Sequence, residues 1–236
     1  MNIKEEKPTC EEIDKKVLRK TLLVRFFMLF ISLGLIFIVT AWTFKYWEGW
    51  AYIFTLAVPM GIFGIYAFIK DPKFLERRMR TKEKRKEQKL VLRLSLVCFP
   101  LIYILPGFDK RFGWSEVSLA IEILGFVMVL LGYLMVLLVF KENSYASRII
   151  EVDKTQTVIS TGLYSVVRHP MYLSSVLLYL FTPLALGSYF AVIPAMFIVL
   201  VFVLRILDEE KELIQNLDGY MEYIQKVKYR LIPGIW

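Results

Sequence analysis

The only histidine of this 236-residue chain, His169, stands between an arginine and a proline in the stretch TGLYSVVRHPMYL. Pro170 disfavours helical geometry at the preceding residue and suits the first turn of a following helix, where its missing N–H costs nothing. We therefore expect a fixed entry from a loop into a helix, with exposed amides that can hold the polar end of a ligand. The plainer alternative is that His169 caps the helix and that Tyr164 and Tyr172 are membrane-interface residues.

A second group of ionisable residues follows in the sequence RILDEEKEL. Arg205 and Glu209 are four residues apart and share a helix face, but with Arg first, the less favourable order for a purely structural pair. Acidic residues are unfavourable at a helix C-terminus, so we predict that this helix continues through EEKELIQNLDGYMEYIQ. The charges could be a solvated helix end. A site that binds both an anion and a cation would need such a pair, and ionisable groups at a membrane are functional candidates.

The elements that must position these residues are apolar blocks. The chain is 57% hydrophobic with a mean hydropathy of +0.53, well above what a soluble core requires. Apolar blocks of about 20 residues form membrane-crossing helices, because lipid offers the backbone N–H and C=O groups no other hydrogen-bond partner. We predict an all-α, polytopic bundle of five or six membrane helices, the last two joined in a hairpin near Pro183 and Gly187, from the blocks Leu22–Phe44, Trp50–Ile69, Leu94–Phe108, Val117–Phe140, Leu173–Leu186 and Phe190–Leu204.

The distribution of basic residues predicts the orientation. If the N-terminus is cytoplasmic, all 30 Lys and Arg except Lys45, Lys110 and Arg111 fall on the cytoplasmic side, as the positive-inside rule requires. Both termini and the active site are then expected to face the cytoplasm. The basic run Lys82–Lys89 is interpreted as lying on anionic headgroups, and no nucleic-acid partner is expected.

The chain divides into two regions by polarity. Residues 1–140 are predicted to be a membrane scaffold, since the first three blocks contain almost no ionisable group apart from Arg25, which can reach the interface. Residues 141–236 hold most of the polar chemistry. Cys10 and Cys98 are too far apart in sequence to imply a disulfide or metal site, one histidine excludes a multi-histidine metal centre, and no cleavable signal peptide or phosphate-binding loop is recognised.

Three spaced motifs, TGLYSVVRHPMY, RILDEEKEL and YMEYIQKVKYRLIP, resemble the C-terminal region of the isoprenylcysteine carboxyl methyltransferase and phospholipid methyltransferase superfamily. The resemblance covers about Gln156–Pro233 and implies an integral membrane enzyme that uses S-adenosylmethionine and releases S-adenosylhomocysteine. It maps substrate handling to Arg205, a supporting role to Arg168, and cofactor contacts to Gln156, Thr157, Val158, Ile159, Tyr164, His169, Pro170, Met171, Tyr172 and Glu209. Two departures are Gln156, where eukaryotic carboxyl methyltransferases carry histidine, and Tyr229, where many members have proline.

The leading functional prediction is carboxyl methylation of a prenylcysteine-like or other lipid-borne acceptor, with Arg205 and Glu209 as the catalytic residues. A carboxylate is ionised at neutral pH and needs no general base, whereas an amine must lose a proton and imidazole titrates near neutrality. The alternatives are a phospholipid amine or small thiol acceptor and, less favoured, an NADPH-dependent membrane reductase. The acceptor is expected to enter from the bilayer, membrane lipids are the expected surroundings, and a monomer is favoured.

Overall fold

The computed structural model describes residues 15–72, 74–75, 86–143 and 156–236, with the backbone alone for 86–94. All regular structure in these ranges is helical, which confirms the all-α prediction. The long helices are α1 (Lys15–Ala41), α2 (Trp47–Lys70), α4 (Lys86–Phe112), α5 (Leu119–Glu142), α6 (Pro170–Ala185) and α7 (Val192–Asn216). A 3-10 turn, η1 (Gly162–Ser165), precedes α6, and the short helix α8 (Tyr220–Lys226) follows α7.

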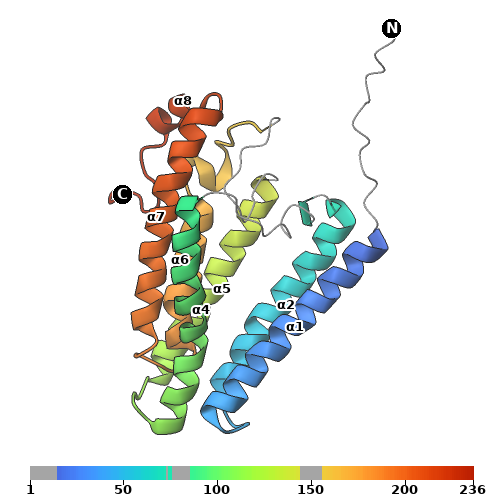
Figure 1. The fold of residues 1–236 in the computed structure, drawn as a ribbon, viewed down its shortest axis with the longest axis vertical. Helices are drawn as coiled ribbons and strands as arrows, with labels where there is room; N and C mark the ends of the chain where they lie inside the picture. The colour runs from blue at the N-terminus through green and yellow to red at the C-terminus, as the bar shows by residue number, and fades with distance from the viewer. Residues whose placement is uncertain (1–14, 73, 76–85, 144–155) are drawn as a thin grey trace.

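The long helices run side by side along the longest dimension of the molecule, and each predicted apolar block lies largely within one of them (Figure 1). Among the described residues, α1, α2 and α5 are long and apolar enough to cross a membrane, and α6 is a shorter apolar helix. Much of their apolar surface is exposed, as expected where lipid rather than protein covers it. The helices therefore form a membrane bundle.

The two ends of the bundle differ in composition. One end carries η1 and α8, and the other carries the turns between α1 and α2, α4 and α5, and α6 and α7 (Figure 1). Exposed aromatic residues cluster at these turns: Trp42, Phe44, Trp47, Trp50, Phe112, Trp114, Tyr189 and Phe190. Such residues favour the boundary between lipid and water, so this end has the composition of a membrane interface.

Close packing between α5 and α6 depends on two glycines. A Cβ atom at Gly125 would lie 2.5 Å from the Ala185 nitrogen, and one at Gly132 would lie 2.9 Å from the Leu178 nitrogen. Small residues at such crossings let the helix backbones approach. This contact fixes the position of α6, the helix that begins directly after His169.

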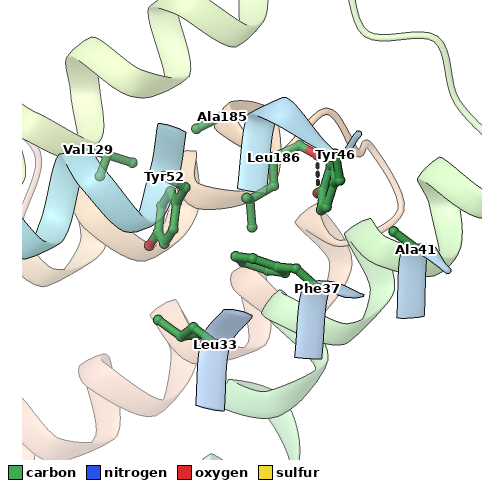
Figure 2. Packing of buried hydrophobic residues seen from close by; sticks show 8 residues of the cluster. All are labelled: Leu33, Phe37, Ala41, Tyr46, Tyr52, Val129, Ala185 and Leu186. Atoms are coloured by element: carbon green, nitrogen blue, oxygen red, sulfur yellow. Dashed lines mark hydrogen bonds between the residues drawn. The ribbon is translucent and has the colours of Figure 1, made fainter. Parts of the chain in front are cut away.

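A buried cluster joins α1, α2, α5 and α6 at the turn end of the bundle (Figure 2). Its polar atoms are paired: the Tyr46 hydroxyl donates to the Leu186 carbonyl at 2.7 Å, and the Tyr52 and Thr182 hydroxyls are 2.7 Å apart. A second cluster of Ile102, Ala195, Ile198 and Phe202 joins α4 and α7, with residues of α6 packed against it. This second cluster is the apolar floor below the candidate site.

One sequence prediction about helix ends is wrong, and the predicted hairpin between α6 and α7 is confirmed. The stretch after Arg205 is not one continuous helix: α7 ends at Asn216, and the chain turns at Gly219, with φ +81°, before α8 begins. Pro183 lies inside α6, and the hairpin turn is made at Gly187, with φ +72°. In both turns glycine supplies the left-handed backbone geometry. Cys10 and residues 144–155 lie outside the described residues, as does the first half of the basic run Lys82–Lys89.

Candidate active site

His169 lies where the sequence predicted, at the entry to α6. Its backbone is non-helical (φ −123°, ψ 60°), and Pro170 occupies the first turn of the helix. The expectation of exposed amides is wrong, however. The Arg168 and His169 amides donate to the carbonyls of Tyr229 and Arg230, each at 2.9 Å. The C-terminal segment, residues 227–236 after α8, therefore lies against the loop before α6. Its carbonyls bind the backbone amides that we expected to be available to a ligand.

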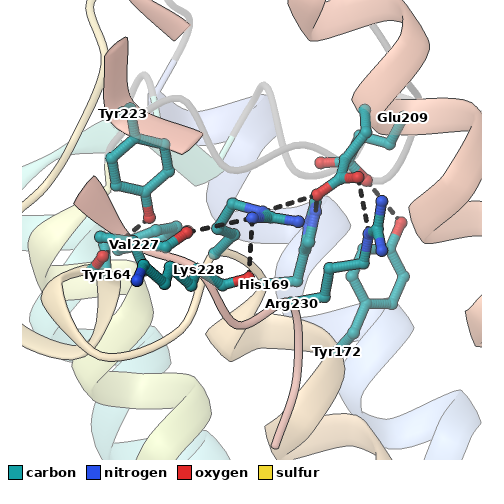
Figure 3. A network of polar contacts seen from close by, with 10 residues as sticks. Tyr164, His169, Tyr172, Glu209, Tyr223, Val227, Lys228 and Arg230 are labelled. Atoms are coloured by element: carbon teal, nitrogen blue, oxygen red, sulfur yellow. Dashed lines mark hydrogen bonds and ion pairs between the residues drawn. The ribbon is translucent and has the colours of Figure 1, made fainter. Parts of the chain in front are cut away.

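Figure 3 shows a network of polar contacts that includes His169, Tyr172, Glu209 and Arg230. The carboxylate of Glu210 is the centre of the ionic part of this network. Its Oε1 accepts from Arg168 Nε at 2.7 Å and lies 3.3 Å from His169 Nε2, and its Oε2 accepts from Arg230 Nε at 2.7 Å. Arg168 Nη1 also donates to the carbonyls of Val227 and Lys228, each at 3.0 Å. The Glu210 side chain thus joins α7 to the loop before α6 and to the C-terminal segment.

The environment of Glu210 keeps it ionised. Burial alone raises the pKa of this carboxyl group, but the hydrogen bonds from His169 and Arg230 and the nearby positive charges bring the pKa down to about 2. An ionised carboxylate only accepts hydrogen bonds, so His169 Nε2 must carry the proton in this contact. The imidazole ring is therefore held by a defined partner.

A second polar cluster, less buried than the Glu210 network, lies at Tyr172 in the first turn of α6. The Tyr172 hydroxyl donates to Glu209 Oε2 at 2.6 Å, and Arg205 Nε donates to the same hydroxyl at 3.4 Å. The Tyr172 ring packs on Phe202, with ring centroids 5.7 Å apart. The predicted approach of the loop before α6 to the helix around Glu209 is confirmed, and both predicted catalytic residues meet at one phenol.

The remaining predicted cofactor residues lie around η1 and α8. Gly162 begins η1 with φ +53°, and a Cβ atom there would collide with the Glu142 carboxylate. The Tyr164 hydroxyl accepts from Asn143 Nδ2 at 2.9 Å, and its carbonyl accepts from the Tyr223 hydroxyl at 2.7 Å. These bonds attach the turn to both α5 and α8.

The segment 156–159, which has no regular secondary structure, lies next to α8, where Val158 packs against the apolar cluster of that helix. Within the segment, Thr157 is exposed, whereas Gln156, Val158 and Ile159 are partly buried. Met171, also partly buried, lies in the first turn of α6 between Pro170 and Tyr172. The structure thus groups the predicted cofactor residues on two sides: the segment 156–159 with Tyr164 near α8, and residues 169–172 with Glu209 above the apolar floor.

Sequence reasoning assigned no role to Glu210, although a signal was present. Ile198, Phe202 and Ile206 are buried at intervals of four residues along α7, and Glu210 is the next position on that face. A carboxylate that continues an apolar stripe must have buried partners. Arg230 had no comparable signal, because it reaches the site only when the C-terminal segment folds back. No group of three or more His, Cys, Asp or Glu side chains in the described part is arranged to hold a metal ion.

Comparison with known proteins bears on this region of the chain. No curated protein matches the sequence. A family model described as phospholipid methyltransferase matches residues 120–218, from the first turn of α5 to the turn before α8. The match includes η1, α6 and most of the site: the loop at His169, and Glu209 and Glu210 on α7. It starts earlier and stops earlier than the predicted range Gln156–Pro233. This region is thus similar to the phospholipid methyltransferase family, and the match agrees with the resemblance of the motifs to that superfamily of membrane methyltransferases.

Proposed function

We propose that this membrane protein transfers the methyl group of S-adenosylmethionine to a lipid-borne carboxylate, such as a prenylcysteine-like acid. The observation that supports this most is the contact of Arg205 and Glu209 with a single phenol, Tyr172, above an apolar floor. A fixed cation and a fixed anion side by side suit a reaction whose two partners carry opposite charges.

The side chains present fit the cofactor. S-adenosylmethionine has a sulfonium and an ammonium group, which a carboxylate attracts, and hydroxyl groups, which carboxylates and phenols can bind. Glu209 is partly exposed, whereas Glu210 is already surrounded by Arg168, His169 and Arg230. Glu209 is therefore the carboxylate available to a ligand. The buried hydroxyl of Tyr220, which has no partner among the described residues, also fits a site that gains a ligand.

Arg205 is proposed to hold the acceptor. Its planar guanidinium can bind a carboxylate through two parallel N–H bonds, and its contact with Tyr172 fixes the direction of the group. In the reaction, a carboxylate oxygen forms a bond to the methyl carbon while the carbon–sulfur bond breaks. The electron pair goes to sulfur, so an ester and S-adenosylhomocysteine result and no proton is transferred.

The protein's contribution is then position rather than acid–base chemistry. Holding two reactants in line can lower the barrier by on the order of 7–11 kcal/mol. The acceptor's tail would remain in lipid beside α6 and α7 while its polar head reaches Arg205. This arrangement, together with the distribution of basic residues, supports a site facing the cytoplasm, with both termini on that side.

An amine acceptor is the second candidate. The family model that matches this chain is described as phospholipid methyltransferase. An amine such as that of a phospholipid headgroup must lose a proton before or during methyl transfer. His169 Nε2 is held by Glu210, an arrangement in which a carboxylate orients an imidazole that can accept a proton at its other nitrogen. A small thiol would be handled in the same way.

The test begins with cofactor binding. Calorimetry of the purified chain in lipid nanodiscs should detect S-adenosylhomocysteine, with NADPH as the comparison ligand. Methyl transfer from labelled S-adenosylmethionine should then be measured to a prenylcysteine acid, a fatty acid, phosphatidylethanolamine and a lipophilic thiol in parallel. Transfer to the acids supports the proposal, and transfer to the amine alone supports the second candidate. Binding of NADPH without S-adenosylhomocysteine would contradict both.

A further inference from the structure

Tyr220 is the first residue of α8, and its side chain is enclosed. Only 4% of the residue is exposed, and it packs with Leu217, Tyr223 and Val227 in the cluster that also receives Val158. The resemblance described above assigns the segment containing Val158 to the cofactor. Tyr220 therefore lies where α8 meets one side of the proposed cofactor site.

The hydroxyl of Tyr220 is buried and has no hydrogen-bond partner in the described part of the chain. Leaving such a group unpaired costs about 1–3 kcal/mol. The neighbouring tyrosines do not share this property, since Tyr223 donates to the Tyr164 carbonyl and Tyr172 to Glu209. An unpaired hydroxyl is therefore specific to this position on α8, not general to the tyrosines of the site.

The surroundings of this hydroxyl restrict what can bind it. Burial and the nearby carboxylates of Glu210 and Glu209 raise the pKa of Tyr220, so the phenol stays neutral and can both donate and accept. The Arg168 guanidinium, which acts in the opposite direction, is already bound to Glu210. Two carboxylates repel a further anion, so a neutral hydroxyl or a cationic ammonium group is the chemistry that suits Tyr220.

We propose that the Tyr220 hydroxyl hydrogen-bonds to a hydroxyl or ammonium group of bound S-adenosylmethionine. The inference rests on the proposed function and adds a cofactor residue outside the region matched by the family model, which ends at residue 218. Since the hydroxyl is enclosed, α8 must shift to admit the ligand group. The turn at Gly219, with its positive φ, is the place where such a shift can occur.

The test exploits opposite effects of one substitution. Tyr220→Phe removes an unpaired buried hydroxyl, so the ligand-free protein should unfold at the same temperature or higher. The same variant should bind S-adenosylhomocysteine roughly threefold to tenfold more weakly by calorimetry, the loss of one hydrogen bond. Tyr223→Phe is the matched control, because it removes a hydroxyl that is already paired and should lower the unfolding temperature without ligand.

The cofactor group can be identified with a second ligand, 5′-methylthioadenosine, which keeps the ribose but lacks the amino-acid part. Weaker binding of both ligands by Tyr220→Phe would assign the contact to a ribose hydroxyl, and weaker binding of S-adenosylhomocysteine alone to the ammonium group. Unchanged affinity for both would overturn the inference and leave the proposed function intact. If the parent protein fails to bind S-adenosylhomocysteine, both fall together.

Discussion

Both ends of the bundle contain buried carboxylates, but the partners of these carboxylates differ between the two ends. At the turn end, Asp109 accepts from the hydroxyls of Ser115 and Ser188, and Glu48 pairs with Lys110 at 2.7 Å. These bonds connect the ends of helices to neighbouring turns. At the α8 end, Glu210 binds three cationic or imidazole groups, and Glu209 and Arg205 remain partly exposed on a shared phenol.

The comparison shows that buried charge alone does not indicate a reactive site. At the turn end, Asp109 has hydroxyl and amide partners and Glu48 pairs with a partly exposed lysine, and these bonds hold helices and turns together. At the α8 end, two adjacent residues have different roles. Glu210 holds the loops together, and Glu209 faces outward, where a ligand can reach it. If this distinction is correct, substitutions at the two ends should affect different measurements.

The largest effect on stability is expected from Glu210→Gln. Removing the charge leaves Arg168, His169 and Arg230 around a neutral amide, and breaking a buried ion pair typically costs about 3–5 kcal/mol. Glu48→Gln is the matched change at the other end. It should cost less than Glu210→Gln, because the partner Lys110 is 40% exposed and stays solvated when the pair is broken. Thermal unfolding in the same nanodiscs measures both, and equal losses would contradict the comparison.

Acid titration tests the same network in the unmodified protein. The folded-state pKa of Glu210 is about 2, below its ordinary value of 4.5, so its contribution to the free energy of unfolding is complete above about pH 4.5. That contribution should decline as the pH falls from there towards 2. The slope of stability against pH in this window should be smaller in Glu210→Gln. Identical slopes in the two proteins would argue against an ionised Glu210 network.

Arg205→Lys should reduce kcat/KM for a carboxylate acceptor by about 100-fold, the size of effect expected from misplaced reactants. Lysine keeps the charge but not the planar pair of N–H donors that orients a carboxylate. Affinity for S-adenosylhomocysteine and the unfolding temperature should change little. Assaying the acid and the amine acceptor in parallel sharpens the result. Near-normal methylation of the acid would remove Arg205 from the acceptor site.

Glu209→Gln should weaken binding of S-adenosylhomocysteine by about 1.5–3 kcal/mol, the usual contribution of a hydrogen bond to a charged group. The amide oxygen can still accept from Tyr172, so the unfolding temperature should be close to that of the parent. Calorimetry and thermal unfolding on one preparation separate the two effects. A large loss of stability with unchanged affinity would give Glu209 the structural role assigned here to Glu210.

The smallest effect is expected from Ser188→Ala at the turn end. Asp109 would lose one hydroxyl donor but keep the Ser115 amide and hydroxyl, so the cost should be about 1 kcal/mol. Affinity for S-adenosylhomocysteine should equal that of the parent. A variant that unfolds normally but binds this ligand weakly would show that the two ends are coupled.

Hydropathy was sufficient to predict the long helices, because each apolar block needs a helix to satisfy its backbone in lipid. It could not predict where α7 ends. Polar and apolar residues alternate on both sides of Gly219, so no change of hydropathy marks the turn. The bend follows from the left-handed geometry at Gly219 and from packing of Tyr220 and Tyr223 against neighbouring segments.

The candidate site was only partly predictable for a related reason. The resemblance to the methyltransferase superfamily brought His169, Tyr172, Arg205 and Glu209 into one hypothesis, and these residues do lie close together. It did not distinguish the outward role of Glu209 from the inward role of Glu210, which depends on helical phase within α7. The contacts of Arg168 and His169 with the C-terminal segment use backbone carbonyls, which have no signature in side-chain sequence.

The pairing of the C-terminal segment with the loop before α6 also determines when the site can form during synthesis. Arg168 binds the carbonyl of Lys228, 60 residues later in the chain, and Glu210 lacks one of its partners until Arg230 has been made. Contacts of such long sequence separation form late, because a long loop must close first. The membrane helices can therefore insert and pack before the reactive end exists, so a nascent chain would acquire its chemistry as the last step of folding.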